Sequence, residues 1–132
     1  MVLESGGQFT IHPNGTSMLP LIHPGRDSVS LAAVPEKLKN GDIVLYLRDS
    51  GEYVLHRIIS ISSGTYTMCG DNQLSLEQGI SRSQIIAVAA GMVINGKSVT
   101  DRSLIYKLYC LLWKSFFIRR VYFKIRRLKN GS

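Results

Sequence analysis

Residues 43–61, IVLYLRDSGEYVLHRIISI, decide the fold of this chain. Two runs rich in β-branched and aromatic residues stand on either side of Asp49-Ser50-Gly51, which is a turn signal between two strands. Runs of the same kind are DSVSLAAV before this stretch and SSGTYTMCGDN, QIIAVAAGMVI and INGKSV after it. Several short strands separated by turns predict a mainly β fold, built as a compact and mostly antiparallel sheet.

The charge of the chain is divided unevenly along its length. The chain has 132 residues, the size of one ordinary domain, and a formal net charge of +7. Residues 1–102 hold eight Lys and Arg against nine Asp and Glu, whereas residues 103–132 hold eight Lys and Arg and no acid. We therefore expect a β domain over residues 1–102, followed by a basic C-terminal segment over residues 103–132.

The C-terminal segment changes from a strand pattern to a helix pattern. SLIYKLYCLLWKSFFIRRVYFKIRRLK has no Gly or Pro, and its apolar residues recur every three to four positions. It predicts one amphipathic helix of about seven turns. Its longest uncharged run is LYCLLW, far short of the roughly 18 apolar residues that a membrane-spanning helix needs.

Two surroundings suit such a helix. Its aromatic and basic side chains fit peripheral contact with an anionic membrane through residues 103–128, and they fit equally a helix packed on the β domain with a solvated basic end. Nucleic acid is a weaker candidate, because no helix-turn-helix pattern precedes the β domain. The sequence gives no indication of the oligomeric state.

Cysteine usage and the first residues set the expected compartment. Cys69 and Cys110 are too few for a disulfide framework, so we expect two free thiols, and no His and Cys cluster has metal-ligand spacing. We expect neither a metal nor another cofactor. MVLESGGQFT lacks the apolar run of a signal peptide, which predicts a protein that is cytoplasmic or peripherally associated with a membrane.

One serine stands in a setting that suits a nucleophile. In GTSMLPLI, residues 15–22, Ser17 lies between Gly15 and Pro20 on a short segment that favours neither helix nor strand. Such a serine is either a turn residue or a nucleophile. A catalytic serine needs a base within hydrogen-bond reach and donors for the oxyanion.

His56 is the histidine best placed to be that base. His12 and His23 lie on Pro- and Gly-rich segments and are expected to be exposed loop residues, whereas His56 lies inside a predicted strand. Alternation along a strand places His56 on one face with Val54 and Ile58. In this apolar setting it is either a core histidine bonded to a backbone carbonyl or a general base.

Asp71 is the third candidate. It follows Gly70 at the end of a predicted strand, in MCGDNQ. There it is either a turn-forming residue or a carboxylate that fixes the tautomer of the imidazole.

Four short motifs in one order resemble a known superfamily. GTSMLPLI, GDIVLY, VLHRII and CGDNQ together resemble the serine peptidases that include type I signal peptidases and self-cleaving LexA-type repressors. The resemblance covers residues 10–95. Ser17-Met18-Leu19-Pro20 matches the serine box Ser-Met-x-Pro, and His56-Arg57 looks like the second box of the members that use histidine instead of lysine. Gly70-Asp71 matches the box that carries an acid.

The resemblance implies a fold and a set of roles. The fold is a coiled antiparallel β-sheet of the signal-peptidase and LexA type. Ser17 would be the nucleophile, His56 the base and Asp71 the residue that orients the imidazole. The activity would be that of a serine endopeptidase acting on an extended peptide or protein substrate with small residues before the cleaved bond.

The chain departs from the family at three points, of which one is Gly25-Arg26-Asp27 where the family usually has Gly-Asp. Bacterial signal peptidases have a serine at the position of Gly15, so the oxyanion hole would rest here on backbone N–H groups, including that of Ser17, with Met18 and Pro20 completing the segment that meets the substrate. We also expect no N-terminal membrane anchor of the kind that signal peptidases have, because residues 1–10 lack an apolar run. The alternative function is therefore an inactive peptide-binding or maturation adaptor that its basic helix tethers to a membrane surface.

Overall fold

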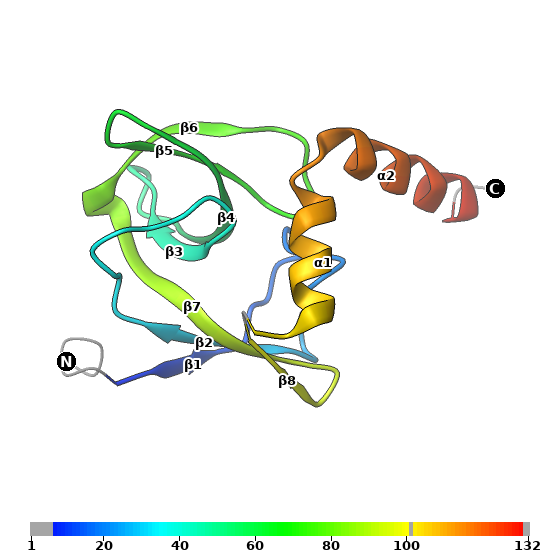
Figure 1. Ribbon diagram of the computed structural model, residues 1–132, viewed down its shortest axis with the longest axis horizontal. Coiled ribbons are helices and arrows are strands. Elements are labelled where there is room, and N and C mark those ends of the chain that lie inside the picture. Colours follow the sequence, from blue (N-terminus) through cyan, green and yellow to red (C-terminus); the bar gives the residue numbers. More distant parts are fainter. Residues whose placement is uncertain (1–6, 101, 131–132) are drawn as a thin grey trace.

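The computed structural model describes residues 7–100 and 102–130, and it has one open antiparallel sheet followed by two helices (Figure 1). The prediction of a mainly β, antiparallel fold is confirmed. The first six residues, on which the expectation about a signal peptide partly rests, lie outside the described residues. In chain order the elements are β1 (Phe9–Ile11), β2 (Ser28–Ala32), β3 (Ile43–Leu47), β4 (Tyr53–Ser62), β5 (Thr65–Cys69), β6 (Glu77–Ser81), the 3₁₀ turn η1 (Arg82–Gln84), β7 (Ile85–Ile94), β8 (Lys97–Val99), α1 (Leu104–Trp113) and α2 (Phe116–Asn130).

The predicted hairpin of residues 43–61 forms the centre of the sheet. The strand order is β1-β2-β7-β3-β4-β5-β6, with β8 paired to β7. In the β3–β4 pair, Val44 lies opposite His56 and Tyr46 lies opposite Val54. Directly opposite residues share a face of the sheet, so Tyr46 and His56 point to the same side.

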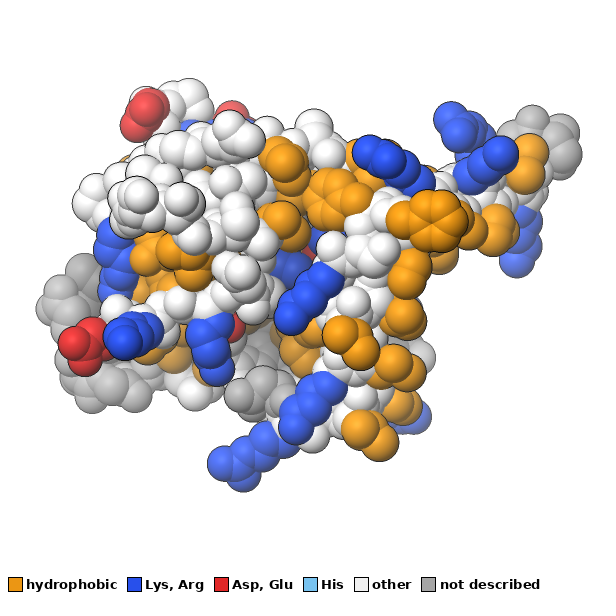
Figure 2. Space-filling view, turned by 45° about the horizontal axis from the view of Figure 1, so that its top comes forward, with side chains coloured by type: hydrophobic (Ala, Val, Ile, Leu, Met, Phe, Trp, Pro, Cys, Tyr) orange, Lys and Arg blue, Asp and Glu red, His pale blue; other side chains and the backbone are white. Residues whose placement is uncertain are grey.

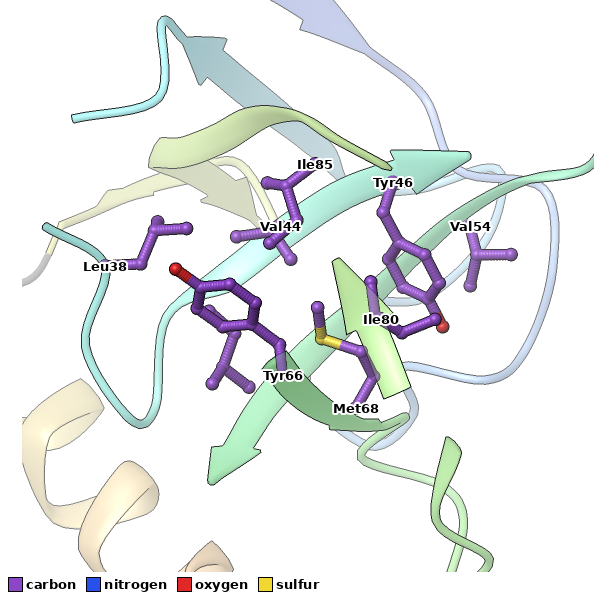
Figure 3. Packing of buried hydrophobic residues seen from close by; sticks show 9 residues of the cluster. Leu38, Val44, Tyr46, Val54, Tyr66, Met68, Ile80 and Ile85 are labelled. Atoms are coloured by element: carbon purple, nitrogen blue, oxygen red, sulfur yellow. The ribbon is translucent and has the colours of Figure 1, made fainter. Parts of the chain in front are cut away.

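Hydrophobic side chains bury both faces of the central strands. One cluster gathers on the side of Tyr46 and His56, and Figure 3 shows nine of its members, with Met68 among side chains from neighbouring strands. The second cluster lies on the other side and includes Met18, Ile22 and Ile43. Since Met18 and Ile22 belong to the segment that carries Ser17, this second cluster fixes the serine segment to the sheet.

The turn between β7 and β8 follows its sequence signal. Asn95 and Gly96 have φ angles of 51° and 81°, the left-handed pair that a two-residue hairpin of this kind requires. Two strands, β1 and β6, have no clear signal in the sequence: β1 has three residues, and β6 is EQGIS.

The prediction of one long C-terminal helix is wrong in one respect, because the segment forms two helices. The break falls at Lys114 and Ser115. Ser115 begins the second helix, since its Oγ accepts a hydrogen bond from the backbone N–H of Ile118 at 3.3 Å and its carbonyl accepts one from Arg119 at 3.1 Å. A serine cap thus starts α2 in a segment that has no Gly or Pro.

The inner side of α1 packs on the β domain, as one of the two alternatives for this segment predicts. Tyr109 lies between Tyr106 and Trp113, with ring centroids 6.4 Å and 4.9 Å away. Trp113 is buried. No helix in the described ranges is long and apolar enough to cross a membrane.

Candidate functional site

The segment after Gly15 holds Ser17 in a tight turn. The carbonyl of Met18 accepts hydrogen bonds from the N–H groups of Leu21 and Ile22, both at 3.0 Å, and the Met18 and Ile22 side chains are buried. Ser17 itself is half-buried. Two buried anchors after the serine therefore fix its backbone while its side chain stays accessible.

A second turn, residues 70–73, is bonded to the serine segment. The backbone N–H of Asn72 donates to the carbonyl of Ser17 at 2.8 Å, and its side-chain Nδ2 donates to the carbonyl of Thr16 at 3.0 Å. The N–H of Asp71 lies 3.5 Å from the sulfur of Met18. The 70–73 turn thus controls where Ser17 lies.

Gly70 lies where these two turns meet the histidine. A Cβ at this position would lie 2.5 Å from the carbonyl oxygen of Ser17 and 3.1 Å from Cδ2 of His56. The first distance is shorter than real Cβ atoms allow, so the serine segment and the imidazole are this close only because residue 70 has no side chain. Glycine is required here because there is no room for a side chain and not because of its backbone conformation, since the φ of Gly70 is not positive.

His56 is buried, with 4% of its surface exposed, and its ring is held by a tyrosine. The Tyr46 hydroxyl lies 3.2 Å from Nδ1 of His56 and donates its hydrogen to Oε1 of Glu77 at 2.6 Å. Because a hydroxyl has one hydrogen and an ionised carboxylate can only accept, Nδ1 must carry the proton of the neutral ring and donate it to Tyr46. Nε2 is then the unprotonated nitrogen, as a general base requires.

Charges around the ring also keep it neutral. Burial and the nearby Arg48 lower the pKa of His56 to about 4, although Glu77 and Asp71 act in the opposite direction. Arg48 in turn binds Glu77, with Nη2 3.0 Å from Oε1. Burial would raise the pKa of Glu77, but the hydrogen bonds from Arg48 and Tyr46 outweigh it and lower that pKa below its usual range. The carboxylate is therefore ionised at neutral pH, and His56 is uncharged.

Ser17 and His56 line the same cavity, which we call the Ser17 cavity. Its volume is about 390 Å³, and its wall includes Ile11 of β1, Leu45 of β3 and Gln73 of the 70–73 turn. In the described part of the chain, the Ser17 hydroxyl makes no hydrogen bond to His56. Catalytic hydrogen bonds are often long in ligand-free proteins and shorten when substrate binds.

The other residues expected around the serine divide between two places. Gly15 and Met18 line the Ser17 cavity, and a Cβ on Gly15 would meet nothing within 4 Å. Pro20 instead lines a separate apolar hollow beside α1. Among the other histidines, His12 is exposed, and His23 is half-buried with its Nε2 3.1 Å from the carbonyl of Pro20. Neither lines the Ser17 cavity.

Asp71 is fully buried, and its partners are not the imidazole. Arg57 donates to both of its carboxylate oxygens, each at 2.8 Å, and the Tyr109 hydroxyl donates to Oδ2 at 2.7 Å. The Nδ1 of His56, which Asp71 was expected to hold, is bonded to Tyr46. Through these hydrogen bonds Asp71 joins β4 to α1, which is a structural role. The groups that orient the imidazole are Tyr46 and Glu77.

The buried charges of Asp71 and Arg57 compensate each other. Burial alone would lower the pKa of Arg57, but the Asp71 carboxylate raises it well above its usual value. Burial and then Asp71 raise the pKa of Tyr109. Arg57 also donates to the carbonyl of Gly41 at 2.8 Å and lies 3.2 Å from the sulfur of Cys110. Cys69 and Cys110 are free thiols.

The junction of the two helices holds the 70–73 turn from the other side. Arg119, which is fully buried, donates from Nη1 to the carbonyls of Gly70 at 3.1 Å and Gln73 at 3.0 Å, and from Nε to the carbonyl of Trp113 at 2.8 Å. The indole N–H of Trp113 donates to the carbonyl of Asp71 at 2.8 Å. The C-terminal helices therefore support the turn that positions Ser17.

Sequence reasoning missed Tyr46, Glu77 and Arg119 as parts of this site. Tyr46 had a signal, because the predicted hairpin places it on the face of His56. Glu77 had none, since it lies on the unexpected strand β6, opposite Met68. Within the described residues, no group of three or more His, Cys, Asp or Glu side chains could hold a metal ion.

Comparisons with known proteins identified no relative of this chain. No family model, no curated protein and no solved structure matches this chain.

Proposed function

We propose that this chain is a serine endopeptidase in which Ser17 is the nucleophile and His56 the general base. The observation that carries the proposal is that Ser17 and an imidazole with a free Nε2 face one cavity, with the 70–73 turn between them bonded to the serine segment. The order of the four sequence motifs supports the proposal. We propose further that the antiparallel sheet of this chain is the coiled β fold of the signal-peptidase and LexA type.

The chemistry follows from the positions of these groups. Ser17 Oγ attacks the scissile carbonyl while its proton passes to Nε2 of His56, and the imidazolium then gives that proton to the leaving amine. Water hydrolyses the acyl-enzyme by the reverse path. While the ring is charged, Nδ1 keeps donating to Tyr46, whose hydroxyl is bonded to the Glu77 carboxylate. This pair stabilises the imidazolium, as a buried carboxylate does in other serine hydrolases.

The oxyanion would be bound by backbone N–H groups. The N–H of Ser17 makes no backbone hydrogen bond in the part of the chain that the structure describes, so it is free to donate to a substrate oxygen. Gly15, which is exposed and lines the cavity, leaves room for the substrate backbone.

The substrate would be an extended peptide. Among the described strands, β1 is the edge of the sheet beyond β2, and its last residue, Ile11, lines the Ser17 cavity. A peptide that pairs with β1 would have its carbonyl groups near Ser17. Apolar wall residues such as Leu45 and Leu55 favour small apolar side chains next to the cleaved bond.

Peptide cleavage by the full chain tests this proposal. A library of extended peptides, read by mass spectrometry, should give products with one preferred position of cleavage. Ser17→Ala should abolish this cleavage, while Ser50→Ala, which changes an exposed turn, should leave the rate unchanged. Cleavage that persists in Ser17→Ala would exclude the mechanism.

A second candidate is binding without turnover. It is favoured by the lack of a hydrogen bond between the Ser17 hydroxyl and His56 in the described residues. In this case library peptides bind to the wild-type chain and to Ser17→Ala with equal affinity, and no product forms with either protein.

A further inference from the structure

The two C-terminal helices carry large hydrophobic side chains on their outer face. Five are exposed on α1 and four on α2, with exposed fractions that reach 83% at Ile105 and 74% at Phe117. We call them the apolar stripe: Leu104, Ile105, Leu108, Leu111 and Leu112 on α1, and Phe117, Val121, Ile125 and Leu128 on α2. Figure 2 shows hydrophobic side chains that follow α1 and continue along α2.

The spacing of these residues is that of an interfacial helix. Phe117, Val121, Ile125 and Leu128 lie three or four positions apart, so they share one side of α2. Basic residues occupy both borders of that side: Arg120, Lys124 and Arg127 on one, and Lys129 on the other. On α1, Lys107 and Lys114 both lie along one border of the stripe.

The stripe is part of a fixed face of the molecule. The opposite side of α1 is held by the hydrogen bonds of Tyr109 and Trp113 to Asp71, and the start of α2 is held by the buried Arg119. The helices therefore do not need to leave the β domain to present their apolar side. The inner side of α1 and the start of α2 are already packed, whereas the side chains of the stripe are exposed.

We propose that the apolar stripe docks this protein on the surface of an anionic lipid bilayer. The helices would lie in the plane of the interface, with the stripe among the acyl chains near the headgroups and the bordering Lys and Arg side chains on the phosphates. Charge complementarity selects this occupant, because residues 103–132 carry eight basic residues and no acidic one. The inference is independent of the proposed peptidase function.

Other occupants fit less well. A second copy of this chain would bring two positively charged borders together around the stripe, and these like charges would repel. Nucleic acid would use the basic residues but would leave Phe117 and Ile125 in water, with exposed fractions of 74% and 59%. A bilayer surface satisfies both the apolar side and its basic borders.

Vesicle flotation with the full chain tests the proposal. The protein should float with vesicles of phosphatidylcholine and phosphatidylglycerol, bind vesicles of phosphatidylcholine alone more weakly by about tenfold or more, and lose affinity in high salt. Soluble glycerol phosphate should not compete, because it offers no apolar layer. Equal binding to both kinds of vesicle, or competition by glycerol phosphate, would overturn the proposal.

Matched variants locate the surface. Ile125→Asp should reduce the affinity for anionic vesicles about tenfold or more, whereas Ile61→Asp, the same change at an exposed isoleucine of β4, should not. Lys124→Glu should also weaken binding, and Lys37→Glu, at an exposed loop position, should not. Circular dichroism confirms that each variant is folded.

Three results would overturn the assignment. The first is unchanged vesicle binding in both Ile125→Asp and Lys124→Glu. The second is a dimer in sedimentation velocity that Ile125→Asp dissociates, with no binding to vesicles. The third is binding to a DNA duplex in the absence of vesicle binding.

Discussion

The hydroxyl of Tyr46 lies 3.2 Å from Nδ1 of His56 and gives its own hydrogen to Glu77. This relationship fixes the tautomer of the buried ring, which lines the Ser17 cavity, and leaves its Nε2 without a proton. It also makes Tyr46 a positioning residue, since it acts only through His56.

Tyr46→Phe tests this relationship. The ring would lose the acceptor of its Nδ1 proton, so we expect cleavage activity to fall about 10- to 100-fold, mainly in kcat. A buried N–H without a partner also costs about 1–3 kcal/mol of folding stability. Steady-state kinetics and urea denaturation measure the two effects. Tyr66→Phe is the matched control, because Tyr66 is buried in the same cluster and should leave kcat unchanged. An unchanged kcat in Tyr46→Phe would exclude a positioning role.

The stability of the protein should fall as the pH is lowered from 7 to 5. Burial lowers the pKa of His56 to about 4, so the unfolded chain binds a proton in this range that the folded chain does not. The loss should be about 2 kcal/mol of unfolding free energy. Glu77 stays ionised at these pH values because its pKa is lowered. Urea denaturation at both pH values measures the loss, and His56→Gln should remove most of it; an equal loss in that variant would contradict the assignment.

Activity should survive at an unusually acid pH for a histidine-dependent enzyme. Because the base is active when neutral and its pKa is about 4, kcat/KM should decline only as the pH falls toward that value. A pH profile of kcat/KM with a peptide substrate measures this decline at acid pH. A decline centred near 6.5 would mean that the ring is solvated in the working enzyme, and one above 7 would point to a different base.

Gly70→Ala should damage the site through space alone. The new methyl group would lie 2.5 Å from the Ser17 carbonyl, which is backbone, so the serine segment would have to move. We expect a stability loss of about 1–3 kcal/mol, as for other overpacked positions, together with a loss of activity. Gly15→Ala is the control for stability, because its methyl group would meet nothing within 4 Å. Thermal unfolding of both variants checks the difference, and equal stabilities would argue against the tight contact at Gly70.

Substitution of Arg119 should destabilise the protein far more than substitution of its neighbour Arg120. Arg119→Ala removes hydrogen bonds to the carbonyls of Gly70, Gln73 and Trp113, and we expect a loss of about 3–5 kcal/mol with impaired activity. Arg120→Ala, at an exposed position, should change stability by about 0.5 kcal/mol or less. Denaturant unfolding measures both. Equal effects would mean that the helix junction does not support the 70–73 turn.

Local patterns in the sequence predict the central part of this fold. The alternation in residues 43–61 gives the hairpin, and the pair Asn95-Gly96 gives the β7–β8 turn with its two positive φ angles. The same alternation places His56 on the face of Val54 and Ile58, with which it is buried. These features depend on neighbours along the chain, which is why the sequence carries them.

Contacts between distant segments could not be predicted in the same way. Arg57 of β4 forms an ion pair with Asp71 of the 70–73 turn, and Arg119 of α2 donates to the same turn. The helical pattern of the sequence runs through Ser115 without interruption, so it does not predict the break that places Arg119 there. The resemblance implies that Asp71 orients His56, because both belong to one set of motifs, but the hydrogen-bond partner of the ring is Tyr46, which is bonded to Glu77.

Covalent labelling of Ser17 tests the central claim most directly. The full chain would be treated with a fluorophosphonate at neutral pH, and the modified residue and its rate would be read by peptide mass spectrometry. The account predicts one adduct, on Ser17, that forms about 100-fold or more slowly in His56→Gln. No adduct on Ser17, or the same rate with and without His56, would contradict it.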